Sequence, residues 1–133
     1  MELKAKDVRT IMLAIEKLSS VDRNSVPKRI SMDNLLFLPE LNHLNKDNLV
    51  YILRKLQEAN YIIGEFKYSG GGLYLATVSE LTFSGHQFLD TIRNNQIFDK
   101  VMEKLDEFGS GVTLEVIKLL ATKLLKEKLG VLI

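Results

Sequence analysis

Basic, amide and aromatic side chains between residues 46 and 74 are of the types that contact nucleic acid. Arginine and lysine bind phosphates, asparagine hydrogen-bonds to base edges, and tyrosine donates to the sugar-phosphate backbone. Five of these side chains lie on the polar side of a region with helical periodicity, and three lie in two strand-like runs beside a glycine cluster. A duplex-DNA interface is therefore one hypothesis, and it uses eight residues: Lys46, Asn48, Tyr51, Arg54, Lys55, Lys67, Tyr68 and Tyr74.

Acidic residues on the same helix oppose this hypothesis. Asp47 and Glu58 would face phosphate charge, and neutralisation of phosphates supplies most of the non-specific affinity for DNA. A mixed, solvated helix face is the alternative interpretation. Lys28 and Arg29 add positive charge beside a predicted edge strand, although protection of an open sheet edge explains them better.

Catalytic and metal-binding chemistry has weaker support. His86 and Asp90 are four residues apart in a predicted helix, so the carboxylate could orient the imidazole, but the sequence offers no nucleophile nearby. A structural hydrogen bond, or an Asp90 to Arg93 ion pair, is the simpler interpretation. His43 and His86 do not have the spacing of metal ligands, and the glycines at 70–72 are not followed by the lysine of a phosphate-binding loop. We therefore predict no enzymatic activity, no metal and no cofactor.

The composition is that of one ordinary globular domain. The chain has 133 residues, 46% of them hydrophobic, a net charge of +1 and no cysteine. A chain of this length can bury a core without disulfides, and the absence of cysteine excludes thiol chemistry. A charge near zero predicts no strong attraction to polyanions. Because uncharged apolar stretches stay well short of the roughly 18 residues that cross a bilayer, we expect a soluble, cytoplasmic protein without membrane contact.

Hydrophobic periodicity and turn residues predict the elements of the first 80 residues. The wide apolar face after Asn45, a good N-cap, predicts a long helix, and Pro39 should end the short helix before it. The order is helix, edge strand, short helix, long helix, strand and strand, over residues 4–18, 26–31, 33–38, 46–59, 61–68 and 73–79. This order predicts an α+β fold, a winged helix-turn-helix with a small three-stranded antiparallel sheet.

Three further helices follow in the sequence. Thr82 is the expected N-cap of the first, in which Gly85 permits close contact with the sheet, and Asn94-Asn95 should break it. Helices over 96–108 and 114–129 then predict a C-terminal helical hairpin. We expect a winged-helix domain over residues 1–95 and the hairpin over 96–133, packed on that domain or on a partner subunit as a single compact unit.

The C-terminal helix has a wider apolar stripe than one small core needs, and three large apolar residues end the chain. A homodimer or a protein partner that covers this surface is one hypothesis. The alternative is that the tail folds back on its own domain. The hypothetical interface consists of Val116, Leu119, Leu120, Leu124, Val131, Leu132 and Ile133.

Two segments carry a resemblance to a known family. They are the run Leu81-Thr82-x-x-Gly85-His86-x-Phe88-Leu89-Asp90-x-Ile92-Arg93 and the junction Leu53-x-x-Leu56-x-x-Ala59-Asn60-Tyr61-Ile62, in which glycine is usual in place of Asn60. The sequence resembles a family of uncharacterised bacterial and prophage proteins, a domain of unknown function. The resemblance implies a winged-helix-like fold and brings no established activity. The chain departs from the family pattern at Asn94, Asn95 and Phe98, where paired aspartates and a tryptophan are common.

Two functions from different classes are consistent with these features. One is a DNA-binding or transcription-regulatory module, and the other is a protein-interaction or oligomerisation module that has the same shape and does not bind DNA. The location of the cations distinguishes them. If these cations converge on one face, DNA binding is favoured, and if they are dispersed among acidic residues, protein interaction is favoured. The cations concerned are Lys28, Arg29, Arg54, Lys55 and Lys67.

Overall fold

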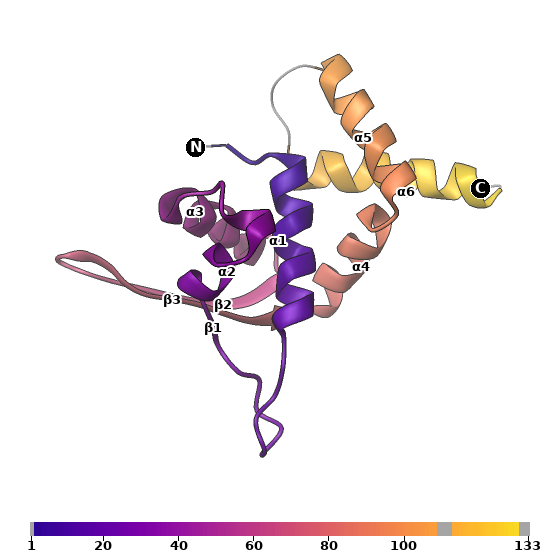
Figure 1. Ribbon diagram of the computed structural model, residues 1–133. Coiled ribbons are helices and arrows are strands. Elements are labelled where there is room, and N and C mark those ends of the chain that lie inside the picture. Colours follow the sequence, from indigo (N-terminus) through magenta and orange to yellow (C-terminus); the bar gives the residue numbers. More distant parts are fainter. Residues whose placement is uncertain (1, 109–112, 131–133) are drawn as a thin grey trace.

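The computed structural model describes residues 2–108 and 113–130. Within these residues the chain forms six α-helices and three strands, which confirms the predicted α+β class (Figure 1). The elements in chain order are α1 (Ala5–Leu18), β1 (Ile30–Ser31), α2 (Met32–Leu36), the 3-10 turn η1 (Pro39–Leu41), α3 (Lys46–Glu58), β2 (Ile62–Ser69), β3 (Gly72–Leu81), α4 (Phe83–Ile92), α5 (Asn95–Phe108) and α6 (Leu114–Leu129).

The three strands form one antiparallel sheet in the order β1-β3-β2. Strands β2 and β3 make a long hairpin in which Ser69 pairs with Gly72, so that only Gly70 and Gly71 form the turn. Gly72 has a φ of +108°, a conformation open almost only to glycine. The hairpin extends beyond the helices (Figure 1). The sequence-based prediction of a three-stranded antiparallel sheet is confirmed.

The predicted strand over residues 26–31 was wrong in its first four positions, because only Ile30 and Ser31 join the sheet. The preceding residues bond instead to the segment after α1. The Asp22 carboxylate accepts from the backbone N–H of Asn24 and Val26, and Lys28 donates its N–H to the Ser20 carbonyl. These local bonds use the backbone groups that a longer strand would need.

The predicted short helix exists but begins earlier and ends earlier than 33–38. Ser31 is its N-cap, and the Ser31 hydroxyl and the Asn34 side chain each accept from the other residue's backbone N–H, a reciprocal capping box. Pro39 then starts η1, a position where its missing N–H costs nothing.

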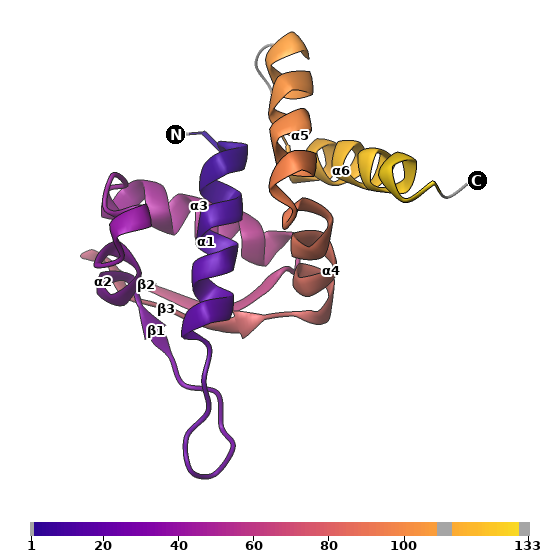
Figure 2. The same cartoon turned by 45° about the vertical axis from the view of Figure 1, so that its right-hand side comes forward.

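Helices α1, α2 and α3 lie on the same side of the sheet in both views (Figures 1 and 2). Their apolar residues and the facing side chains of the strands form one continuous core that extends to α4, α5 and α6. The largest fully buried side chains include Ile11, Leu35, Leu53, Phe88 and Ile92. The core therefore holds the N-terminal and C-terminal halves together.

The segments α3, β2 and α4 are closely packed where they meet. Asn60 ends the α3 segment with a φ of +64°, a left-handed conformation that asparagine tolerates better than most residues. Thr82 caps α4 and donates its hydroxyl to the Asn60 carbonyl at 2.6 Å. A Cβ on Gly85 would lie 2.0 Å from the Tyr61 carbonyl oxygen. The expected close approach at Gly85 is thus confirmed, and its partner is Tyr61, the residue before β2, whose ring stacks on Phe88 at 4.7 Å.

The two C-terminal helices cross each other and do not run side by side as a hairpin would (Figures 1 and 2). Helix α6 packs against α4 as well as α5, and Ile117 and Ala121 are its fully buried residues. Covering two helices at once requires α6 to turn away from α5. The predicted break at Asn94-Asn95 is confirmed, since the Asn94 side chain accepts from the Ile97 N–H as the N-cap of α5.

Candidate functional site

An open groove of about 350 Å³ lies between α3 and the β2–β3 hairpin. Helix α3 contributes Lys46, Tyr51 and Arg54, and the hairpin contributes Tyr68 and Leu73. The Arg54 guanidinium lies 5.6 Å from the centre of the Tyr68 ring, a cation-π distance. Four of the eight residues in the DNA-interface hypothesis therefore meet here, with Asp47 and Val50 completing the lining.

Local sequence signals position this groove. The Asn45 side chain accepts from the Asn48 N–H, so α3 begins at Lys46 and directs its first turn toward the hairpin. The hairpin register pairs Tyr68 with Leu73, which puts both side chains on one face. Because Phe66 is packed against the core, strand alternation places Tyr68 on the same, helix-covered face.

A second groove of about 240 Å³ adjoins the first and shares Lys46 and Leu73 with it. Tyr74 lines this second groove and is 65% exposed. Ser31, Met32 and Asp33 form its other wall, at the start of α2. Lys46 therefore stands where the two grooves meet.

Lys55 and Asn48 belong to α3 but do not line either groove. The Lys55 ammonium lies 3.2 Å from the Glu58 carboxylate and 5.5 Å from the centre of the Tyr51 ring. Asn48 is half-buried in the first turn of the helix. Because Glu58 balances the charge of Lys55, this lysine adds little net positive potential to the surface.

Lys67 lies on the opposite face of β2 from Tyr68, by the same alternation. Its ammonium is 3.0 Å from the Glu65 carboxylate, and the Arg29 guanidinium is 3.5 Å from that carboxylate. The hydrogen bond from Lys67 holds the pKa of Glu65 below its ordinary value. Arg54, Lys55, Lys67 and Arg29 therefore do not converge on one face, and three of the four sit beside acids.

A second polar cluster joins α1 to α4. The Arg93 guanidinium makes two hydrogen bonds of 2.8 Å to the Glu16 carboxylate and also bonds Asp90. The hydrogen bond from Arg93 lowers the pKa of Glu16, and the same bond raises the pKa of Arg93. His86 has its Nδ1 3.5 Å from Glu16. The predicted Asp90 to Arg93 pair is confirmed, whereas the imidazole of His86 faces Glu16 and not Asp90.

The other histidine pairs with the one buried charged residue of the described chain. Asp7 is 8% exposed in the first turn of α1, and its carboxylate lies 2.9 Å from Nε2 of His43. His43 and His86 thus have separate carboxylate partners. Among the described residues, no group of three or more histidine or acidic side chains could hold a metal ion.

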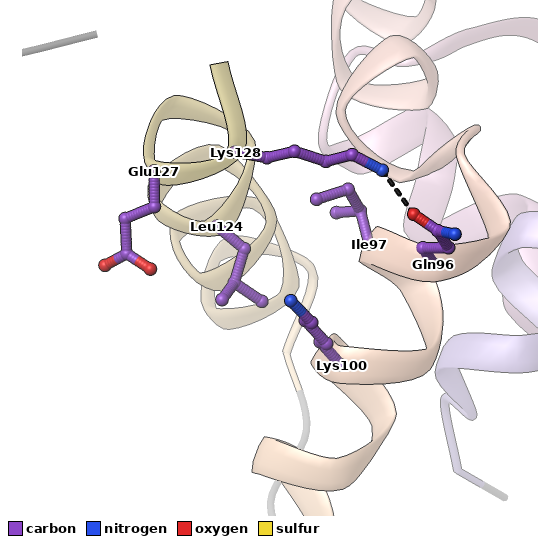
Figure 3. A pocket seen from close by; sticks show the side chains of 6 residues that line it. All are labelled: Gln96, Ile97, Lys100, Leu124, Glu127 and Lys128. Atoms are coloured by element: carbon purple, nitrogen blue, oxygen red, sulfur yellow. Dashed lines mark hydrogen bonds between the residues drawn. The ribbon is translucent and has the colours of Figure 1, made fainter. Parts of the chain in front are cut away.

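A third groove, of about 240 Å³, lies between α5 and α6 (Figure 3). The Lys128 ammonium crosses it to donate to the Gln96 side-chain oxygen, and Lys100 points toward Leu124 from α5. Glu127 points away from the other lining residues (Figure 3). The Lys128 to Gln96 bond joins the end of α6 to the start of α5.

The structure divides the hypothetical oligomer interface into three groups. Leu119 is 64% exposed. Val116, Leu120 and Leu124 are half-buried and pack against the core of their own chain. Residues Val131, Leu132 and Ile133 lie outside the described residues.

Sequence reasoning missed Arg9, which joins α1 to the α4–α5 junction. Its guanidinium donates to the carbonyls of Ile92 and Arg93 and to the side-chain oxygen of Asn95, at 2.6 to 2.8 Å. It also lies 4.8 Å from the centre of the Phe98 ring. Nothing local marks Arg9 in the sequence, because all four partners lie more than 80 residues away.

Comparison with known proteins places the chain in a family. A family model described as hypothetical protein (DUF2513) matches residues 2–112. The chain belongs to the DUF2513 family. This DUF2513 chain is also similar to the crystal structure of smu.1704 from Streptococcus mutans UA159, at 16% identity and a TM-score of 0.44, over 85% of this chain and 98% of the other. No curated protein matches the DUF2513 chain. In the part that the structure describes, its helices are too short or too polar to span a membrane.

Proposed function

We propose that the chain is a non-enzymatic winged-helix module that contacts duplex DNA through α3 and the β2–β3 hairpin. The element order and the strand order β1-β3-β2 support this proposal, because a winged helix has the same helix, strand, two helices and hairpin. In such modules the second helix of the helix-turn-helix enters the major groove and the hairpin contacts the backbone. Helix α3 and the β2–β3 hairpin occupy these two positions.

The observation that carries the proposal is the groove in which α3 and the hairpin bring Lys46, Arg54, Tyr51 and Tyr68 together. Two cations and two phenol groups from separate elements form one concave, solvent-open surface. Cations contact phosphates, and tyrosine hydroxyls donate to the backbone. An arginine such as Arg54 is also the residue type that binds guanine through two hydrogen bonds.

The charge of this surface limits the affinity. Two groove cations correspond to about two phosphate contacts, which give a slope of about −2 in log K against log salt concentration. Asp47 in the groove opposes them. The expected binding is therefore weak and measurable chiefly at low salt.

A fluorescence anisotropy titration with duplex fragments at low salt tests the proposal. Arg54→Ala should weaken binding about fivefold, in line with the loss of one charge-assisted contact worth roughly 1 kcal/mol. Arg23→Ala is the matched control, since it removes one exposed guanidinium from the loop after α1. Equal losses in the two variants would mean that only net charge matters, and the groove assignment would be wrong.

A protein-interaction module is the second candidate, and the ion pairs favour it. Lys55 is paired with Glu58, and Lys67 shares the Glu65 carboxylate with Arg29, so two of the predicted phosphate contacts already sit beside acids. The groove then presents tyrosines and apolar side chains to a peptide. Absence of DNA binding at micromolar protein and low salt would favour this candidate over the first.

A further inference from the structure

We propose that α6 pairs antiparallel with α6 of a second copy of this chain. The surface concerned is the solvent face of the helix. Ile117 and Ala121 are fully buried on the side that packs against α4 and α5. The opposite side carries Glu115, Leu119, Thr122 and Lys126, which recur at steps of four, three and four and so form one straight line along the helix.

This line is complementary to itself when it is reversed. Its centre lies midway between residues 120 and 121. Glu115 precedes the centre by the same number of residues as Lys126 follows it, and Leu119 and Thr122 are related in the same way. A two-fold axis through this centre therefore places each Glu115 opposite Lys126 of the other copy, and each Leu119 beside Thr122. This is an isologous contact, the commonest symmetry among homo-oligomers.

The charges select a second copy in this orientation. A parallel pair would place Glu115 against Glu115 and Lys126 against Lys126, and like charges at such positions are destabilising. Within the described chain neither residue has an ion-pair partner, so both are available to a second copy. Lys118 and Lys123 lie on opposite edges of the face and do not meet across the axis.

The apolar centre of the line supplies the burial. Leu119 is 64% exposed, although Val116, one turn before it, and the adjacent Leu120 are partly covered by their own chain. An antiparallel copy would cover Leu119 with the methyl group of Thr122 and the apolar stem of a lysine. Two helices of 16 residues bury an area at the low end of specific interfaces, so the dimer should depend on concentration in the micromolar range.

Helix α6 extends away from the hairpin side of the molecule in both views (Figures 1 and 2). A dimer through α6 therefore leaves the α3 groove of each copy free. The pairing goes beyond the proposed DNA contact and does not depend on it, because it uses a different surface.

Sedimentation of charge-reversal variants without DNA tests the pairing. Glu115→Lys and Lys126→Glu should each weaken dimerisation about tenfold, because each turns two attractive pairs of the dimer into repulsive ones. The double variant exchanges the two charges and should restore the dissociation constant to within about threefold of the original. A double variant weaker than both single variants would overturn the antiparallel arrangement.

Effects on the helix itself act in the opposite direction. Glu115 lies in the first turn of α6 and Lys126 in its last turn, where each charge interacts favourably with the helix dipole and stabilises the helix. The double variant loses both favourable positions, so a purely intrahelical role makes it the least stable of the four proteins. Recovery of dimerisation in the double variant therefore cannot come from helix stability.

Cross-linking supplies a second readout. Because the chain has no cysteine, Thr122→Cys introduces one thiol close to the two-fold axis. Oxidation should link two copies of this variant, and it should leave Ser20→Cys, on the exposed loop after α1, unlinked. A wild-type chain that sediments as a monomer throughout the micromolar range refutes the pairing. Arg54→Ala should leave sedimentation unchanged, so failure of the dimer and failure of DNA binding are separate results.

Discussion

Replacing Gly85 by alanine sets two effects of opposite sign against each other. Alanine is the better helix former by about 1 kcal/mol, so helix propensity alone predicts a more stable protein. The Cβ, however, would lie 2.0 Å from the Tyr61 carbonyl oxygen and 2.9 Å from its carbon, and both are backbone atoms that no rotamer change can move. The start of α4 must therefore move away from the start of β2.

Three interactions weaken when these segments separate. The Thr82 N–H donates to the Tyr61 carbonyl at 3.0 Å, the Thr82 hydroxyl donates to the Asn60 carbonyl, and the Tyr61 ring stacks on Phe88. Overpacking of a core costs about 1–3 kcal/mol, a lost hydrogen bond about 1 and a lost aromatic pair about 0.5–1.5. We expect Gly85→Ala to lower the free energy of unfolding by about 2–4 kcal/mol after the gain in propensity.

Urea denaturation followed by far-ultraviolet circular dichroism measures this change. Gln87→Ala is the control, because Gln87 is exposed in the same helix and its replacement should change stability by less than about 0.5 kcal/mol. A Gly85→Ala protein that is as stable as the original, or more stable, would show that α4 can shift without cost. The assignment of Gly85 to close packing would then be wrong.

Three further predictions concern stability and are tested by the same denaturation measurements. Asn60→Ala should lower the free energy of unfolding by about 1 kcal/mol, because the left-handed conformation at a φ of +64° is unfavourable for alanine. Glycine adopts this conformation freely, so Asn60→Gly should be nearly neutral. Equal losses in the two variants would contradict this reason. Arg9→Lys should lower the free energy of unfolding by about 2 kcal/mol, since an ammonium cannot reach two carbonyls and Asn95 together. Full stability of the lysine variant would show that the positive charge alone suffices. Glu16 has a lowered pKa, so its contribution to stability is present above the unfolded-state pKa of about 4.3 and is lost as the pH falls through the folded value. Arg93→Ala should therefore flatten the decline in stability on acidification, and an unchanged pH profile would refute that linkage.

Local signals made the helices and their starts predictable. Asn45 and Thr82 were identified as N-caps from residue type and position, and each accepts from the backbone N–H three residues later. The strand at 26–31 failed because the Asp22 side chain offers these residues a competing set of hydrogen bonds. Residue type does not reveal that competition.

The groove was predictable only in part. That Arg54 and Tyr68 meet follows once α3 packs on β2. Placing Lys67 with them was an error of one residue along a strand, where each step reverses the face. The pairings of Arg9 and of Glu16 with the α4–α5 region had no signal in the sequence, because their partners lie some 80 residues away.

The partners of α1 have a consequence for synthesis of the chain. α1 leaves the ribosome before β3 and α4, yet it packs against both, and Arg9 bonds to the carbonyls of Ile92 and Arg93. At about 5–20 residues per second, its apolar face stays without these contacts for several seconds after the helix is made. The nascent N-terminal half is therefore the stretch most exposed to chaperones and to aggregation, and completion of α4 is the event that ends this exposure.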